Sequence, residues 1–318
     1  MERVKEAVGW VAWEVGRRSF RARRRVASVG LRTKLAWYGG RVGDVELCGG
    51  GRVQLSALDE SYLSFELFWK GWTYYEPYTA LLLCELLQGA ATFVDVGANI
   101  GYFALTAATC QRQVEVVAFE PNPKLSRILD ANVQRNGLPV KIERAAVSDR
   151  VGVARFFLPA SDMSGTLEAG FNERVEDVIE VPTTTLDVAL TARSAKGPMV
   201  IKVDAEGHEP AILRGASELL SRAGPDLLLE VTEDYDRETV AALHRLGYSF
   251  FTITHRGLER SDGLRVAREG DLLFLNTLVT RRPEREIAAL SAKLAEGFAR
   301  ISPSATCHNR PLRAVGGG

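Results

Sequence analysis

The sequence has 318 residues, with 40 Lys and Arg against 40 Asp and Glu, and the formal net charge is therefore zero. With 25% charged and 46% hydrophobic residues it is typical of a globular protein with a sizeable core, in one large domain or two small ones. This balance excludes a molecule built as a whole for nucleic acid. No run approaches the roughly 18 apolar residues of a membrane span, and the short stretch Ala7–Trp13 lacks the cleavage site of a secretory signal.

The first 72 residues form a distinct, partly basic region. Residues 1–34 hold ten Lys and Arg against three Glu, with valines at helical spacing, so we expect a basic helix there. Such an asymmetry indicates either peripheral contact with a membrane surface or a solvated basic segment. The alternating stretch around Gly49, Gly50 and Gly51 then predicts a β-hairpin.

From residue 76 onward, apolar runs alternate with amphipathic helical patterns. Continuous apolar strands followed by such helices predict an α/β fold, a mostly parallel sheet covered by helices on both faces. The predicted strands are 91–97, 114–120, 140–147, 199–205, 225–231, 248–254 and 271–277. The predicted helices are 76–89, 102–110, 123–137, 209–222 and 237–247.

Two segments depart from this alternation. Residues 152–158 and 177–186 predict two extra strands around a polar loop, residues 160–170, in which Met163–Leu167 could cover a ligand as a lid. Residues 281–318 predict one C-terminal helix and a frayed tail beyond Ser302. We therefore expect three regions, with boundaries at 1–72, 73–280 and 281–318.

The turn after the first strand of the alternating region has the pattern D-x-G-x-N-x-G. Asp95 is followed by Gly97, Asn99 and Gly101, and Asn tolerates the positive φ that a glycine would otherwise supply. A glycine-rich turn between a strand and its helix is where open α/β sheets hold nucleotides, but this spacing is not the GxGxxG of a pyrophosphate reader. It matches the loop of class I methyltransferases.

Acidic residues end the next two predicted strands as well. Glu120 stands where a carboxylate accepts from ribose hydroxyls, and Asp149 where one can accept from an adenine amino group. A pocket with three carboxylates and no Lys or Arg in the loop favours a cation, such as the sulfonium of S-adenosylmethionine. The alternatives are NAD, which Glu120 alone would also suit, and acids that merely end strands.

Together, five stretches make the chain resemble the FkbM-type family of S-adenosylmethionine-dependent methyltransferases over residues 73 to 276. They are FVDVGANIGYFAL, VVAFEPNPKLSRILDANVQRNG, AAVSD, TTLD and VIKVDAEGHEPAILRGA. The resemblance implies a seven-stranded class I sheet with its last strand antiparallel. It also implies cofactor contacts from Asp95, Gly97, Ala98, Asn99, Gly101, Glu120, Asn122 and Asp149. For Glu76, cofactor contact and helix capping both remain open.

Members of this family mostly methylate hydroxyl oxygens, so the resemblance implies a hydroxyl-bearing acceptor, a glycan sugar or a small natural product. The stretch KVDAEGHE ends the fourth predicted strand with five ionisable side chains that could serve catalysis: Lys202, Asp204, Glu206, His208 and Glu209. Asp204 or His208 is the candidate general base. Glu206 and Glu209 would orient the substrate, although Glu209 could simply satisfy the helix dipole. Glu230, at the end of the fifth strand, could face the acceptor.

Three other functions remain to be weighed. Six arginines in residues 17–25 suggest an RNA methyltransferase as an alternative, but this segment lacks the aromatic residues with which RNA-binding proteins stack on bases. A nicotinamide dehydrogenase and a non-catalytic binder of the cofactor are the others. Cys48, Cys84, Cys110 and Cys307 form no CxxC pair, so we expect no metal site, free thiols and a cytoplasmic protein, with peripheral contact at the inner membrane surface through residues 1–34.

Overall fold

The computed structural model describes residues 42–299 and Ile301, apart from residues 59, 160–164, 170–174, 192–196, 233–234, 236, 270–271 and 300. The predicted basic helix and the tail beyond Ser302 lie outside the described residues. Among the helices of the described part, none combines the length and the hydropathy required to cross a bilayer.

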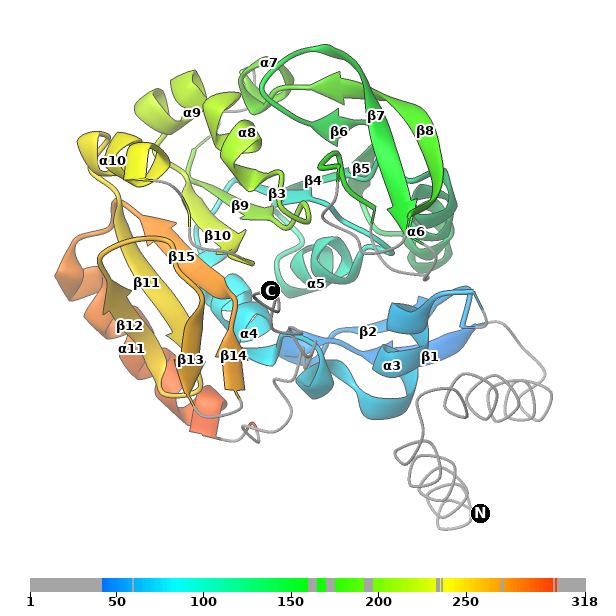
Figure 1. Cartoon of the computed structure of the whole chain (residues 1–318). Helices are drawn as coiled ribbons and strands as arrows, with labels where there is room; N and C mark the ends of the chain where they lie inside the picture. Colours follow the sequence, from blue (N-terminus) through cyan, green and yellow to red (C-terminus); the bar gives the residue numbers. More distant parts are fainter. Residues whose placement is uncertain are drawn as a thin grey trace, which may run out of the picture.

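The main sheet confirms the predicted α/β fold (Figure 1). Its order is β12 (Gly257–Ser261), β11 (Ser249–Thr254), β15 (Asn276–Thr280), β10 (Asp226–Glu230), β9 (Met199–Val203), β3 (Thr92–Val96), β4 (Glu115–Phe119) and β5 (Val140–Glu143). Strands β10, β9, β3, β4 and β5 pair in parallel, and β15 runs antiparallel between β10 and β11. Seven strands thus have the predicted class I order, and β12 adds an eighth at the β11 edge.

Helices cover both faces of this sheet, because its central strands are apolar on both sides. One apolar core holds residues of α4 (Pro77–Leu86), α5 (Tyr102–Cys110), α6 (Pro123–Asn136) and α11 (Glu284–Ala299). The other holds residues of α7 (Leu186–Leu190), α8 (Glu209–Arg214), α9 (Ser217–Arg222) and α10 (Arg237–Arg245). In α6, for example, Leu125, Ile128, Leu129 and Val133 share the buried face at helical spacing.

The predicted N-terminal hairpin is present and packs on the sheet's helical layer. Strands β1 (Gly43–Glu46) and β2 (Arg52–Leu55) pair antiparallel around the short helix η1 (Cys48–Gly50), and α3 (Tyr62–Lys70) and η2 (Trp72–Tyr74) follow. The backbone N–H of Ser56 donates to the Asn132 side chain on α6 over 2.7 Å. Residues of the hairpin share the core of α4, α5 and α6.

The two extra strands predicted after residue 150 are also present. Strands β7 (Gly152–Pro159) and β8 (Val175–Thr184) pair antiparallel, and β6 (Ala146–Val147) joins β8 in parallel to give a separate three-stranded sheet. In Figure 1 this sheet lies beside the β5 end of the main sheet.

Several predicted elements are interrupted in the structure. The expected strand 140–147 is divided into β5 and β6, which belong to different sheets. The expected strand 271–277 breaks at Leu275, because β14 (Leu272–Phe274) pairs with β13 (Ala267–Glu269) and β15 enters the main sheet. The expected helix 209–222 breaks at Gly215, where a Cβ would lie 2.1 Å from the carbonyl oxygen of Ser148.

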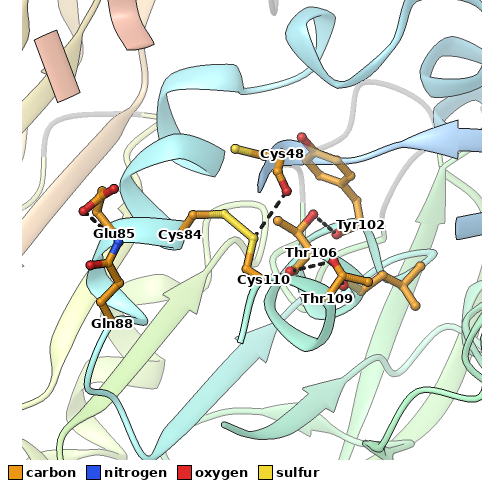
Figure 2. The surroundings of a disulfide bond; sticks show 9 residues. Cys48, Cys84, Glu85, Gln88, Tyr102, Thr106, Thr109 and Cys110 are labelled. Atoms are coloured by element: carbon orange, nitrogen blue, oxygen red, sulfur yellow. Dashed lines mark hydrogen bonds between the residues drawn. A yellow bond between two sulfur atoms is a disulfide. The ribbon is translucent and has the colours of Figure 1, made fainter. Parts of the chain in front are cut away.

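The expectation of free thiols is wrong for two of the four cysteines. Cys84 on α4 and Cys110 at the end of α5 form a disulfide, with their Cα atoms 6.1 Å apart (Figure 2). The Cys110 sulfur also lies 3.3 Å from the backbone oxygen of Cys48, whose own thiol is free and buried. The pairing depends on the packing of α4 against α5, which cysteine spacing alone does not reveal.

Candidate functional site

A pocket of about 430 Å³, open to solvent, lies at the carboxyl ends of β3, β4 and β9. The pocket is lined by Val96, Gly97, Phe119, Glu120, Pro121, Ala145, Ala146, Val147, Phe156, Gly165, Leu167, Asp204, Ala205 and His208. The lining thus combines one edge of the main sheet with residues of the inserted segment after β6.

Close packing of two loops explains the first glycine of the predicted cofactor turn. Gly97 has φ +81°, and a Cβ there would lie 1.9 Å from the carbonyl oxygen of Asp204. The N–H groups of Gly97 and Ala98 both donate to the carbonyl of Phe119 over 3.0 Å. Only glycine therefore lets the β3 turn approach the β9 turn this closely.

The other two turn residues also have the backbone that the sequence indicates. Asn99 has φ +54°, and its side chain accepts from the N–H of Ile100 over 2.8 Å. Gly101 has φ +93°, and a Cβ added there would lie 2.4 Å from a Leu129 methyl group. Asparagine thus replaces a glycine at a left-handed position, as the pattern predicts.

Asp95 lies behind this turn and outside the pocket lining. Its carboxylate accepts from the N–H of Ala104 in the first turn of α5 over 3.0 Å, and the residue is only 1% exposed. Burial raises the pKa of Asp95 to about 7, against the lowering influence of Lys202. Asp95 therefore fixes the start of α5 relative to the sheet.

Glu120 lines the pocket and is held by two backbone donors. Its carboxylate accepts from the N–H groups of Asn99 and Asn122, each over 2.8 Å. Asn122 in turn caps α6 by accepting from the N–H of Lys124 over 2.9 Å. Burial raises the pKa of Glu120 to about 7, although both backbone donors lower it. The remaining acceptor positions of this carboxylate are available to a ligand hydroxyl.

Asp149, like Asp95, is not among the residues that line the pocket. Its carboxylate lies 3.6 Å from Arg214 and 3.7 Å from Arg150, and its side chain is 35% exposed. The reason is the division of the expected third strand, since β5 ends at Glu143 and the chain then crosses into the second sheet. Of the three acids predicted to converge, only Glu120 contributes to the pocket wall.

Strand β9 carries a buried lysine, Lys202, that forms ion pairs with two carboxylates. Lys202 is 2% exposed, with its ammonium 2.9 Å from Asp204, 4.0 Å from Glu76 and 4.5 Å from the ring centre of Phe103. Burial disfavours the charge, but Asp204 and Glu76 outweigh it and raise the pKa of Lys202 above its usual value. Glu76 has φ +41° and accepts from the Asn276 side chain over 3.0 Å, so it links α4 to β15.

Glu230 stands beside this group at the end of β10. Burial, and then the charges of Asp204 and Glu206, raise the pKa of Glu230 well above its usual value. Burial and the neighbouring carboxylates likewise raise the pKa of the Tyr75 hydroxyl. The end of the sheet beside Asp204 therefore has more buried acids than bases.

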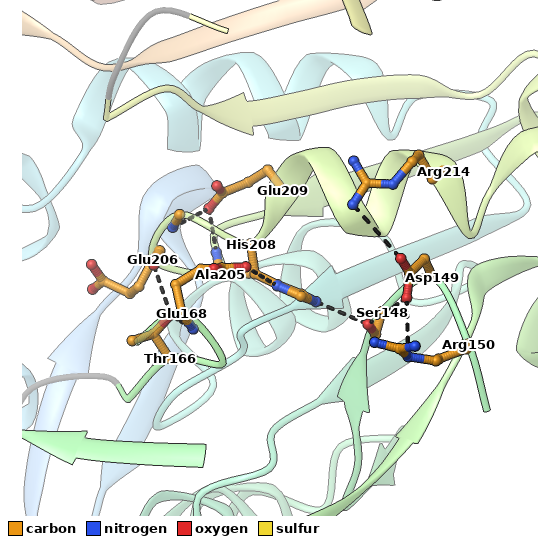
Figure 3. A network of polar contacts seen from close by, with 11 residues as sticks. Ser148, Asp149, Arg150, Thr166, Glu168, Ala205, Glu206, His208, Glu209 and Arg214 are labelled. Carbon is orange, nitrogen blue, oxygen red and sulfur yellow. Dashed lines mark hydrogen bonds and ion pairs between the residues drawn. The ribbon is translucent and has the colours of Figure 1, made fainter. Parts of the chain in front are cut away.

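The turn after β9 arranges the remaining predicted residues (Figure 3). Glu209 accepts from the N–H groups of Ala205 and Gly207 over 2.8 and 3.3 Å, so its carboxylate shapes the turn, and burial raises its pKa to about 7. Glu206 has φ +52°, and its backbone oxygen accepts from the Thr166 hydroxyl over 2.8 Å.

His208 bonds to two residues that the sequence analysis did not single out. Its Nδ1 lies 2.6 Å from Glu168 and its Nε2 lies 2.9 Å from the Ser148 hydroxyl. Glu168 comes from the predicted polar loop, residues 160–170, directly after the predicted lid Met163–Leu167, of which Gly165 and Leu167 line the pocket. No sequence pattern connects these positions, because they are 40 and 60 residues from His208.

The lining has the chemistry that a sulfonium nucleoside requires. Its two carboxyl groups, Glu120 and Asp204, are accompanied by no Lys or Arg in the described lining, and most of the other lining residues are apolar. A pyrophosphate would meet no compensating cation here, whereas a cationic nucleoside would meet hydrogen-bond acceptors and apolar walls.

Comparison with known proteins identifies the family. The profile described as "Methyltransferase FkbM domain" matches residues 95–250. The 31-O-demethyl-FK506 methyltransferase FkbM of Streptomyces tacrolimicus is 30% identical over 236 residues, which cover 64% of this chain and 84% of that protein. This chain belongs to the FkbM methyltransferase family. It is therefore an S-adenosylmethionine-dependent methyltransferase, as the resemblance of its motifs implies.

Two further similar proteins are named as methyltransferases. The hexuronic acid methyltransferase AglP of Haloferax volcanii is 29% identical over 162 residues, which cover 51% of this chain and 64% of that protein. Among solved structures, methyltransferase FkbM of Methylobacillus flagellatus KT has a TM-score of 0.38 at 16% identity, covering 60% of this chain and 43% of that one. The fold assignment of this FkbM-family chain comes from its strand order and not from that weak likeness.

Proposed function

We propose that this FkbM-family enzyme transfers the methyl group of S-adenosylmethionine to a hydroxyl of a glycan sugar or a small natural product. Two relatives support this acceptor class, since their names describe methylation of 31-O-demethyl-FK506 and of a hexuronic acid. The observation that carries the proposal is the pocket itself, in which Glu120 and Asp204 stand at the ends of β4 and β9.

Glu120 is the residue we assign to the ribose of the cofactor. Its carboxylate is fixed by the N–H groups of Asn99 and Asn122, which leaves acceptor positions for hydroxyl donors. The neighbouring Gly97 and Ala98 close the turn around the same site. When bound, S-adenosylmethionine supplies an electrophilic methyl group on sulfur, and the protein's task is to align and deprotonate the acceptor.

Asp204 is the candidate that accepts the hydroxyl proton. It lines the pocket, and its ion pair with Lys202 fixes the position of one carboxylate oxygen. Glu230, whose pKa is raised well above its usual value by burial and by Asp204, can hold a proton beside it. A general base in this position contributes roughly 100-fold or more to the rate.

Ligand-induced stabilisation and methyl transfer test the proposal separately. S-adenosylhomocysteine should raise the melting temperature of the protein, NAD should not, and Glu120→Ala should remove the response. Asp204→Asn should still respond to S-adenosylhomocysteine but lose transfer of labelled methyl groups into lipid, glycan or small-molecule fractions. Asp262→Asn, an exposed site paired with Arg265, is the matched control and should behave as the wild type. Full turnover by Asp204→Asn would refute the assigned role.

We also propose that residues 1–34, which lie outside the described residues, attach the protein to the inner membrane surface near a lipid-linked acceptor. The support is their charge, ten Lys and Arg against three Glu. Vesicles containing anionic lipid should float the full chain but not a chain that begins at Leu35. Equal flotation of the two would remove this proposal.

A further inference from the structure

The part of the pocket next to Glu120 is a slot with apolar walls from two layers of the protein. Pro121 follows β4 of the main sheet, Ala145 and Val147 lie just before and in β6 of the second sheet, and Phe156 and Leu167 belong to the segment after β6. Walls of this kind suit a flat heteroaromatic ring. Because Glu120 is the ribose residue of the proposed function, the slot next to it is the place for the base of the nucleoside.

His208, in the turn between β9 and α8, is a polar residue of the pocket lining. Figure 3 shows its ring directed toward Ser148 and away from Glu206. A carboxylate can only accept, so Glu168 at 2.6 Å assigns the proton of a neutral ring to Nδ1. The Ser148 hydroxyl, 2.9 Å from Nε2, then donates to an acceptor nitrogen. In this tautomer of the neutral ring, His208 Nε2 is a hydrogen-bond acceptor.

The segment that carries Glu168 is fixed at both sides. Thr166 exchanges two backbone hydrogen bonds with Phe157 of β7, of 2.8 and 3.1 Å. Its hydroxyl donates to the carbonyl of Glu206 over 2.8 Å and accepts from the N–H of Glu168 over 3.0 Å. The Thr166 side chain thus ties the inserted segment to the turn after β9, and this places Leu167 in the pocket wall and Glu168 against His208.

We propose that His208, oriented by Glu168, recognises the amino edge of the adenine base of the methyl donor, and that residues 165–169 close the base slot. The inference rests on the proposed cofactor. An acceptor nitrogen at this position pairs with the exocyclic amino group of adenine and opposes the oxygen that hypoxanthine carries there. Ser148 has a second partner, the Asp149 carboxylate at 3.4 Å, when the base takes its place at Nε2.

Binding of two nucleoside probes tests this role without catalysis. Titration calorimetry compares S-adenosylhomocysteine with S-inosylhomocysteine, its 6-oxo analogue, on the full chain. The wild type should prefer the amino compound by roughly tenfold or more, because the 6-oxo group cannot donate to Nε2 and its oxygen opposes the lone pair of that nitrogen. His208→Phe should bind S-adenosylhomocysteine about three- to tenfold more weakly and lose the preference. His244→Phe, on α10 against Phe250, is the matched control and should change neither value.

Glu168→Gln provides a second, milder variant, since this side chain is 47% exposed and its replacement keeps the packing. It should reduce the preference about two- to threefold, because a charge-assisted bond becomes a neutral one. If both variants kept the wild-type preference for S-adenosylhomocysteine over S-inosylhomocysteine, the inference would be overturned. This includes the case in which His208→Phe loses only turnover, because His208 would then act on the acceptor. If the wild type bound neither nucleoside, the proposed function itself would fail together with the inference.

Discussion

Replacement of Gly97 by alanine tests how the two halves of the site are joined. In the structure Gly97 has φ +81°, and an added Cβ would lie 1.9 Å from the backbone oxygen of Asp204. Both partners belong to backbone that is fixed by the central strands β3 and β9, so neither can move away cheaply. The substitution should therefore separate the cofactor turn from the turn that carries the candidate base.

The expected loss of stability in Gly97→Ala is the sum of two contributions. A non-glycine residue in the left-handed region costs about 1–2 kcal/mol. Overpacking in a well-packed interior costs roughly a further 1–3 kcal/mol. Gly97→Ala should therefore lower the free energy of unfolding by about 2–5 kcal/mol, a large part of the roughly 5–15 kcal/mol of a typical domain.

Gly50 supplies a matched control, because its φ is +79° and an added Cβ would meet no atom within 4 Å. Gly50→Ala should show only the backbone contribution, about 1–2 kcal/mol. Urea unfolding of both variants measures the difference, and calorimetry with S-adenosylhomocysteine measures binding, which only Gly97→Ala should weaken. Equal losses of stability in the two variants would refute the reasoning.

Three further predictions concern titration and crosslinking. Burial raises the pKa of Glu120 to about 7, so calorimetry should show S-adenosylhomocysteine binding weakening as pH falls below 7, and Glu120→Gln should flatten this dependence. Burial raises the pKa of Glu209 to about 7 in the folded protein, so between about pH 4.5 and 7 the folded protein holds a proton that the unfolded chain releases. In this range urea unfolding should show the wild type losing stability relative to Glu209→Gln as pH rises. A difference in stability that stays constant with pH would contradict this. Cys84→Ala should lower the free energy of unfolding by roughly 3–4 kcal/mol under oxidising conditions, for a separation of 26 residues, and most of this difference from the wild type should disappear in excess reductant.

The central part of the fold could be predicted because its strands are apolar on both faces. Strands β3, β9 and β10 are buried along their whole length, so they appear in the sequence as continuous apolar runs. Strand β12 was missed because its residues, GLERS, are mostly polar at an exposed edge. The break at Leu275 depends on which neighbour each half of the run pairs with, and that is a tertiary property.

Some residues of the candidate site could also be predicted from the sequence, and others could not. Glu120 and Asp204 could be placed from the sequence, because each ends a parallel strand and the carboxyl ends of such strands share one edge. Asp149 was expected there on the same reasoning, but its strand leaves the sheet before reaching it. Glu168 and Ser148 meet His208 only through the inserted segment and the second sheet, and their sequence positions show no periodicity that connects them.

The buried charges beside Asp204 give a reason for cofactor choice that is independent of the glycine spacing. Lys202 shares its surroundings with the carboxylates of Glu76, Asp95 and Asp204, and the charge of Glu230 also acts on it. Burial disfavours such an excess of negative charge, and the ligand-free protein can relieve it by binding protons, which agrees with the raised pKa of Asp95. A cationic ligand relieves the same excess without protons, whereas a pyrophosphate would add to it. A single acid would suit either ligand, but these acids together favour a sulfonium nucleoside over a dinucleotide.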